Sequence, residues 1–173
     1  NEYTIVDLPG SYSLSANSDE EIITRDYIAE GNADLVCILV DASQLERSMY
    51  MLADYAGIET PAMLLVNMMD VATGLGKQVS CDQSEKRLGI PVLPFVAADR
   101  NYYDKFFIRM HQALIDRKRL NTEAIETLYA DTLGEDYRNL KQKIKPIGRY
   151  SSMWLSVKCL EGDSVVRGQV LAQ

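Results

Sequence analysis

Two short loops carry the residues whose types and spacing could do chemistry. The first is Asp7-Leu8-Pro9-Gly10, where a carboxylate after an apolar run is followed three residues later by glycine. Mg²⁺ prefers oxygen ligands and keeps several of its waters, so Asp7 could hold this ion through a water molecule. Gly10 has no Cβ, and its backbone N–H could therefore approach a terminal phosphate closely. Alone, the pattern is more often a plain turn at the end of a strand.

The second loop is Asn67-Met68-Met69-Asp70. An aspartate at this place can accept two parallel hydrogen bonds from N1 and the 2-amino group of guanine, a donor pair that adenine lacks. A site with such paired polar groups rejects the analogue that leaves them unpaired. Asn67 would brace the loop and reach the major-groove edge of the purine. Alone, this pattern is more often a capped turn.

A third loop, Phe95-Val96-Ala97-Ala98-Asp99, follows the next apolar run. Its small residues would let a backbone N–H reach O6 of guanine. The three loops together indicate a guanine-nucleotide site much more strongly than any of them does alone.

The elements that must position these loops are strands alternating with helices. Residues 35–40 and 62–66 are apolar on both faces, as in parallel strands covered by helices on each side. Residues 3–6 predict a short strand, and residues 90–96, with two prolines, predict one near an edge. Helical patterns follow at residues 19–28, 45–57, 79–88 and 106–115. This order predicts an α/β fold with a parallel sheet, in which ligands bind beyond the carboxyl ends of the strands.

The pattern changes after Arg117-Lys118-Arg119. From residue 121 onward the chain has helical patterns and no good strand, with breaks at Gly134 and at Pro146. We therefore expect an α/β domain over residues 1–118 and a small helical segment over residues 119–173.

Composition argues against several other classes of protein. The chain has 173 residues, of which 47% are hydrophobic and 25% charged, and its net charge of -7 disfavours a nucleic-acid binder. No apolar run approaches the ~20 residues that span a bilayer, and the start is not a signal peptide. The single histidine, His111, leaves little for a histidine-based metal or catalytic site, and three cysteines without a CxxC pair predict reduced thiols.

The loops resemble the third, fourth and fifth motifs of a translation-factor-related GTPase. More narrowly, the chain resembles the FeoB ferrous-iron transporter family. The stretches that carry this resemblance are residues 6–14, 26–28, 40–47 and 66–70, and, in the helical segment, residues 149–150, 154–155, 158 and 160–163.

The resemblance implies a P-loop-GTPase-like parallel sheet with helices on both faces, followed by an all-helical segment. It implies binding of GTP or GDP with Mg²⁺, and slow hydrolysis, at the cytoplasmic face of the bacterial inner membrane beside a membrane domain that carries iron(II). The helical segment would favour bound GDP and relay the nucleotide state to that membrane domain. The implied nucleotide-binding residues are Asp7, Gly10, Asn67, Met68, Asp70, Val96, Ala97 and Ala98, with Asp7 also holding Mg²⁺ through water in the complete protein.

The chain departs from this family in one respect. It contains no GxxxxGK[ST] motif, since Gly74-Leu75-Gly76-Lys77-Gln78 lacks the hydroxyl residue and the preceding strand. We expect the guanine-recognising half of the site to be present and the phosphate-binding half to be reduced to Asp7 and Gly10. Nucleotide binding by this chain alone should then be weak or undetectable, without meaningful hydrolysis, and no catalytic residue is assigned.

The family's first strand would lie between the strands at Ile5 and Val36, and its absence leaves three arrangements open. The Ile5 strand could pair directly with the Val36 strand, a second chain could complete the sheet, or the segment could exist in the intact protein. We favour truncation over an evolved non-GTPase, and a homo-oligomer through sheet edges stays open. The alternative function is a non-catalytic interaction module with a degenerate G fold, and a third is another GTPase such as a ribosome-assembly factor.

Overall fold

Three parallel strands form the sheet in the computed structural model, which describes residues 2–9, 14 and 18–173. The strands β1 (Val36–Asp41), β2 (Ala62–Asn67) and β3 (Val92–Pro94) lie in the order β1-β2-β3. Asp41 pairs with Asn67, and Val66 pairs with Pro94, so the three strands end at one edge of the sheet. The predicted α/β class with a parallel sheet is confirmed.

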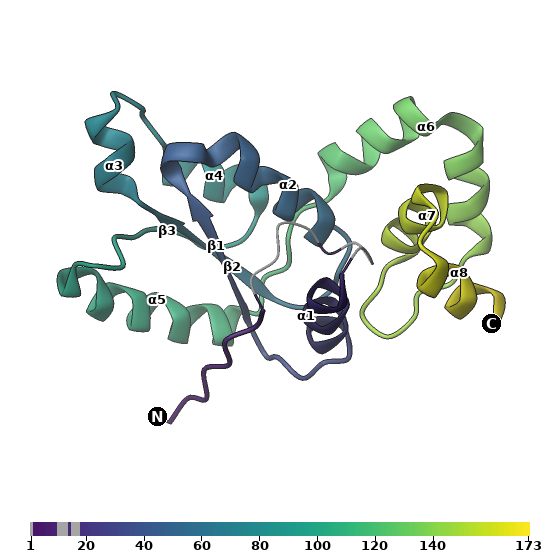
Figure 1. Ribbon diagram of the computed structural model, residues 1–173, viewed down its shortest axis with the longest axis horizontal. Coiled ribbons are helices and arrows are strands. Elements are labelled where there is room, and N and C mark those ends of the chain that lie inside the picture. The colour runs from purple at the N-terminus through teal and green to yellow at the C-terminus, as the bar shows by residue number, and fades with distance from the viewer. Residues whose placement is uncertain (1, 10–13, 15–17) are drawn as a thin grey trace.

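Helices cover both faces of this sheet (Figure 1). On one face, Met63 and Leu65 of β2 pack against Met110 and Ala113 of α5. On the other face, alternate residues of the strands pack against α1 and α2 in the larger core. The helices are α1 (Asp19–Ala29), α2 (Leu45–Tyr55), α3 (Met69–Gly74), α4 (Cys81–Leu88), α5 (Tyr103–Asp116), α6 (Glu123–Lys143), α7 (Ser152–Glu161) and α8 (Ser164–Leu171), with 3-10 turns η1 (Ala42–Gln44) and η2 (Arg100–Tyr102).

The strand predicted at residues 3–6 does not form. Residues 2–9 have no regular secondary structure, and Ile5 and Val6 are exposed to 68% and 49%. The Tyr3 hydroxyl instead hydrogen-bonds to Nδ1 of His111 on α5, at 2.5 Å. The segment has the β-rich composition of a strand, but its backbone is not paired with any strand of the described structure. The arrangement in which it pairs directly with β1 is therefore wrong.

Burial on both faces was predicted for two strands and holds for only one. In β2, residues from Ala62 to Val66 are all buried, whereas in β1 Cys37 and Leu39 are exposed. Leu39 pairs with Leu65, so both side chains lie on the face that α5 covers at β2. The prediction fails at β1 because the α5 residues Met110 and Ala113 pack against Met63 and Leu65 of β2, whereas Cys37 and Leu39 stay exposed.

The last three helices form what we call the helical unit, α6 to α8. In it α7 packs against both α6 and α8, and Trp154 of α7 is buried. The break predicted at Gly134 is confirmed: its backbone is non-helical, at φ 63° and ψ -142°, so α6 consists of two helices joined at a kink where glycine tolerates this conformation. The last helix, α8, is capped by the Asp163 carboxylate.

Within the described ranges, no helix is both long and apolar enough to cross a membrane. The same residues contain no cluster of three or more histidine, cysteine or acidic side chains arranged to hold a metal ion.

Candidate functional site

The loop after β2 turns the chain sharply from strand to helix. Asn67 is the last residue of β2, Met68 has a left-handed backbone with φ 60°, and α3 starts at Met69. A non-glycine residue in this conformation is strained, and such strain is concentrated at functional sites. The turn places Asp70 in the exposed first turn of α3. Met69 packs against the core, whereas Met68 is 40% exposed.

A hydrogen bond joins this loop to the loop after β3. The backbone N–H of Ala97 donates to Oδ1 of Asn67 at 3.0 Å. The amide of Asn67 therefore presents Nδ2, a donor, on its other side. Val96 is half-buried, and Ala97 and Ala98 are exposed beside it. The structure thus brings together Asn67 and the loop of residues 96–98, as the sequence predicted.

One backbone N–H of this loop is already bonded within the chain. A backbone N–H of the loop was expected to reach O6 of a guanine, and that of Ala97 donates to Asn67. The next backbone donor along the exposed loop is the N–H of Ala98, which could take over that contact. The Ala97 carbonyl is also engaged, since it accepts a hydrogen bond from the Tyr103 hydroxyl at 2.9 Å.

Aromatic side chains support the loop after β3 from beneath. Phe95 is buried, and its ring lies 5.7 Å from the ring of Tyr103 and 5.8 Å from that of Phe106. These residues fix the direction in which α5 leaves the loop and thereby place the Tyr103 hydroxyl. Sequence reasoning missed Tyr103; the only signal was the Tyr102-Tyr103 pair shortly after the small residues.

The loop after β1 is braced as well. Oδ1 of Asp41 accepts hydrogen bonds from the backbone N–H and the hydroxyl of Ser43, so Asp41 caps the turn. The Ser43 carbonyl accepts a hydrogen bond from the Lys77 ammonium group. Lys77 therefore links the loops that follow β1 and α3.

Asp7, predicted for the phosphate side, is exposed. Two hydrogen bonds of its segment are made to α5 and α1: Tyr3 with His111, and the Pro9 carbonyl with the Thr24 hydroxyl at 3.2 Å. Neither contact leads to the loops after β2 and β3. Gly10 lies outside the described residues.

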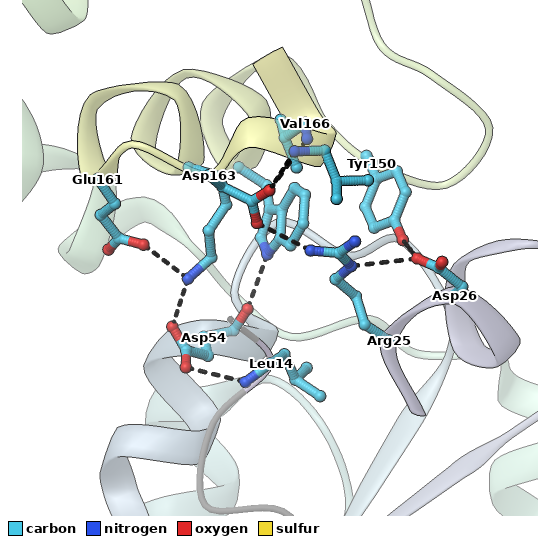
Figure 2. Close-up of polar contacts among 11 residues, drawn as sticks. Leu14, Arg25, Asp26, Asp54, Tyr150, Glu161, Asp163 and Val166 are labelled. Atoms are coloured by element: carbon cyan, nitrogen blue, oxygen red, sulfur yellow. Dashed lines mark hydrogen bonds and ion pairs between the residues drawn. The ribbon is translucent and has the colours of Figure 1, made fainter. Parts of the chain in front are cut away.

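A second group of polar side chains lies between the α/β part and the helical unit (Figure 2). Arg25 of α1 is buried and pairs with Asp26 at 3.1 Å and with Asp163, the cap of α8, at 2.9 Å. Burial lowers the pKa of Arg25, but its hydrogen bond to Asp26 and the nearby negative charges outweigh this and leave the pKa raised. The Tyr150 hydroxyl donates to Asp26 at 3.0 Å, and its pKa is raised by burial and by the Asp26 charge.

Comparison with known proteins bears on this geometry. The family model for the N-terminal region of ferrous iron transport protein B, FeoB_N, matches residues 1–109. The chain is 34% identical over 168 residues to the Fe(2+) transporter FeoB of Escherichia coli strain K12 and 32% identical over 167 residues to that of Salmonella typhimurium. Each match covers 94% of this chain and 21% of the relative. The chain thus spans about a fifth of the length of these relatives.

Solved structures show the same fold. The FeoB G-domain from Methanococcus jannaschii is 41% identical with a TM-score of 0.61, and the match covers 63% of this chain and 68% of that one. The cytosolic domain of T. maritima FeoB in its GMPPNP form is 25% identical with a TM-score of 0.79, covering 96% and 66% of the two chains. Its GDP form I gives 25% identity and a TM-score of 0.80, covering 96% and 64%.

Proposed function

Since the chain belongs to the family of ferrous iron transport protein B, FeoB_N, we propose that it serves a ferrous iron transporter as part of its guanine-nucleotide-binding region. We propose further that it carries the base-recognising half of the nucleotide site. The observation that carries this proposal is the hydrogen bond between Asn67 and Ala97, which holds the loops after two neighbouring strands together at the edge where such sheets bind ligands.

The chemistry of this edge suits guanine. The Asp70 carboxylate would accept hydrogen bonds from N1 and the 2-amino group, and the Asn67 Nδ2 group would donate to an acceptor on the major-groove edge of the base. The N–H of Ala98 would donate to O6. Met68 and Val96 would lie along the ring. Because adenine lacks the donor pair that Asp70 requires, the site would discriminate against it.

The phosphate side of the site is far less complete in this chain. Asp7 is a single exposed carboxylate, which suits Mg²⁺ only as one ligand acting through water, and Gly10 would offer one backbone N–H. No GxxxxGK[ST] motif is present in the sequence. Because charge-assisted bonds to phosphate provide much of the affinity of such sites, the chain alone would bind GTP or GDP weakly and would not hydrolyse GTP.

We place the boundary between the G domain and the helical segment at residue 118. The helical segment, residues 119–173, would favour bound GDP and relay the nucleotide state to the membrane domain of the transporter, at the cytoplasmic face of the inner membrane. This assignment is supported by the match to transporters about five times as long as this chain.

A second candidate function is favoured by one observation. β1 is an edge strand of the three-stranded sheet formed by the described residues, and its side chains Cys37 and Leu39 are exposed on one face. An uncovered edge of this kind is a template for pairing with another chain. The alternative is therefore a non-catalytic module that binds a partner, or a second copy of itself, through β1.

Nucleotide titration tests the first proposal in two steps. With this chain alone, fluorescent GDP should bind with a Kd well above micromolar, and sub-micromolar affinity would overturn the claim that the phosphate half is incomplete. In a polypeptide that also carries a phosphate-binding loop, Asp70→Asn should shift preference from guanine to xanthine nucleotides. Asp82→Asn, a change at an exposed aspartate in the first turn of α4, is the matched control and should leave the preference unchanged. An unchanged preference in Asp70→Asn would rule out Asp70 as the base reader.

A further inference from the structure

Three parts of the molecule meet at the side chain of Asp54, near the end of α2. Oδ2 of Asp54 accepts a hydrogen bond from the backbone N–H of Leu14 at 3.0 Å. Oδ1 accepts one from the Lys158 ammonium group of α7 at 2.8 Å. The Asp54 carbonyl accepts a third from the indole N–H of Trp154 at 2.8 Å. Figure 2 shows the Asp54 carboxylate beside Leu14, joined to its backbone N–H by a dashed line.

Burial makes these contacts strong. Leu14 is 1% exposed, and the side chains of Lys158 and Asp54 are 2% and 20% exposed. Hydrogen bonds to charged groups in such surroundings are about twice as strong as neutral ones. The second carboxylate on Lys158, that of Glu161 at 2.8 Å, is 49% exposed and makes no such link to Leu14.

In the sequence, Leu14 lies between the Asp7-Leu8-Pro9-Gly10 motif and α1. Eleven residues further on, α1 makes its own contact with the helical unit, through Arg25 and the Asp163 cap of α8. The helical unit is therefore linked to the preceding chain at two places. It is linked to Leu14 through Asp54, and to α1 through Arg25. The two cations also share one ring, since Arg25 and Lys158 each lie 5.8 Å from the centre of the Trp154 ring.

We propose that Asp54 is a positioning residue that couples the backbone at Leu14 to the helical unit through Lys158. This inference rests on the proposed function, because the Asp7-Leu8-Pro9-Gly10 motif, which precedes Leu14 in the sequence, is the part of the chain expected to meet the terminal phosphate. A carboxylate is one rigid planar group, so it cannot turn to follow Lys158 without weakening its bond to Leu14, and the reverse holds as well. A shift of the Leu14 backbone would thereby alter the contact that holds α7.

Amide hydrogen exchange in this chain tests the coupling without any nucleotide. Lys158→Met removes the ammonium group but touches no atom of Leu14, and Glu161→Gln removes the other partner of the same lysine. The coupling predicts that Lys158→Met raises the exchange rate of the Leu14 amide about tenfold, the scale of one charged hydrogen bond, whereas Glu161→Gln leaves it unchanged. An unchanged rate in Lys158→Met, or equal rates in the two variants, would overturn the inference.

Asp54→Asn provides a second route should Lys158→Met not fold. This variant keeps the shape of the side chain but replaces one acceptor oxygen by a donor, so it must lose either the Leu14 or the Lys158 bond. Faster exchange should then appear at Leu14 together with altered exchange in α7, and a change confined to one of them would contradict coupling.

A nucleotide measurement separates this inference from the proposed function. In a polypeptide that also carries a phosphate-binding loop, Lys158→Met should change the rate of GDP release at least threefold, and Glu161→Gln should not. Absence of any guanine-nucleotide binding there would overturn the proposed function, while the exchange experiment would still decide the coupling. Normal binding with an unaltered release rate would overturn the coupling alone.

Discussion

Asn67 and Ala97, thirty residues apart in the chain, are joined by a 3.0 Å hydrogen bond between the side-chain Oδ1 of one and the backbone N–H of the other. This bond links the loops after β2 and β3 and sets which donors face outward. Because the bond is made within the chain itself, it restrains both loops. A ligand that binds there has less loop ordering to impose, which favours affinity.

Asn67→Ala should destabilise the fold as well as the site. The Ala97 N–H would lose its acceptor, and the typical net cost of one hydrogen bond is about 1 kcal/mol. Urea unfolding followed by circular dichroism would measure the loss. Asn32→Ala, at an exposed loop residue whose amide bonds only to the exposed Glu30, should cost less than about 0.5 kcal/mol. Equal losses of unfolding free energy in the two variants would show that the Asn67 bond does not stabilise the fold.

Asp163→Asn should be much more costly than an ordinary surface change. Asparagine caps a helix nearly as well as aspartate, so the variant keeps the start of α8 but removes the charge that faces buried Arg25. Breaking a buried pair from one side costs about 3–5 kcal/mol, and we expect the lower end because Asp26 still pairs with Arg25. Thermal and urea unfolding would measure this.

The matched control for that charge removal is Asp99→Asn. Asp99 also caps a helical turn, η2, through a bond from the Asn101 N–H, but it has no buried cation beside it in the described structure. It should lose less than about 1 kcal/mol. A loss at Asp163 no larger than at Asp99 would contradict the importance assigned to the Arg25 pair.

Glu85 should make stability depend on pH in the acid range. Burial raises the pKa of Glu85, but hydrogen bonds from the Arg109 guanidinium, at 2.5 Å, and from the Val92 N–H, at 2.9 Å, outweigh this and leave the pKa lowered. A carboxylate with a lowered folded-state pKa contributes stability above its unfolded pKa, about 4.3, and loses that contribution as pH falls through the folded value.

The stability advantage of the native chain over Glu85→Gln should therefore be full near pH 7 and shrink steadily below about pH 4.3. Urea midpoints measured from pH 7 to pH 3 would show this. Glu2→Gln, at an exposed residue outside the helices and strands, should give a difference that is small at every pH. If the difference in urea midpoint between the native chain and Glu85→Gln is constant with pH, the bonds from Arg109 and Val92 do not depend on the charge of Glu85.

The local sequence pattern was enough to predict those helices and strands whose burial determines which residue types they contain. The two-sided run of β2 and the helical periodicity of α2 were recognisable because burial imposes them on the sequence. The strand expected at residues 3–6 was wrong because strand formation depends on a neighbour, which is not encoded in the segment itself. Leu39 was expected to be buried because leucine is typical of a protein core. Whether a side chain on this strand is covered depends on where α5 lies, and the strand sequence does not encode that.

The sequence predicted only those site residues that belong to recognisable motifs. Asn67 and the 96–98 loop could be placed together because parallel strands end at one edge of a sheet. Tyr103 and Asp54 could not be found in this way, since their roles come from contacts with residues distant in the chain or from side-chain direction. Lys158 was recognised only as part of a family resemblance, and its burial against Asp54 is a property of the packed structure.

Leu39→Lys tests whether the uncovered face of β1 has a partner. Leu39 is 59% exposed, so a lysine there should change the free energy of unfolding by less than about 0.5 kcal/mol. If chains associate through this strand, a charge on it should oppose the contact, because charged side chains are the device that natural edges use against pairing. Sedimentation equilibrium should then show association of the native chain that weakens at least tenfold in Leu39→Lys.

Leu171→Lys, at an 86% exposed residue in the last turn of α8, is the control that adds the same charge elsewhere. Equal weakening in both variants would point to net charge, and a native chain that stays monomeric at high concentration would remove the observation on which the alternative function depends.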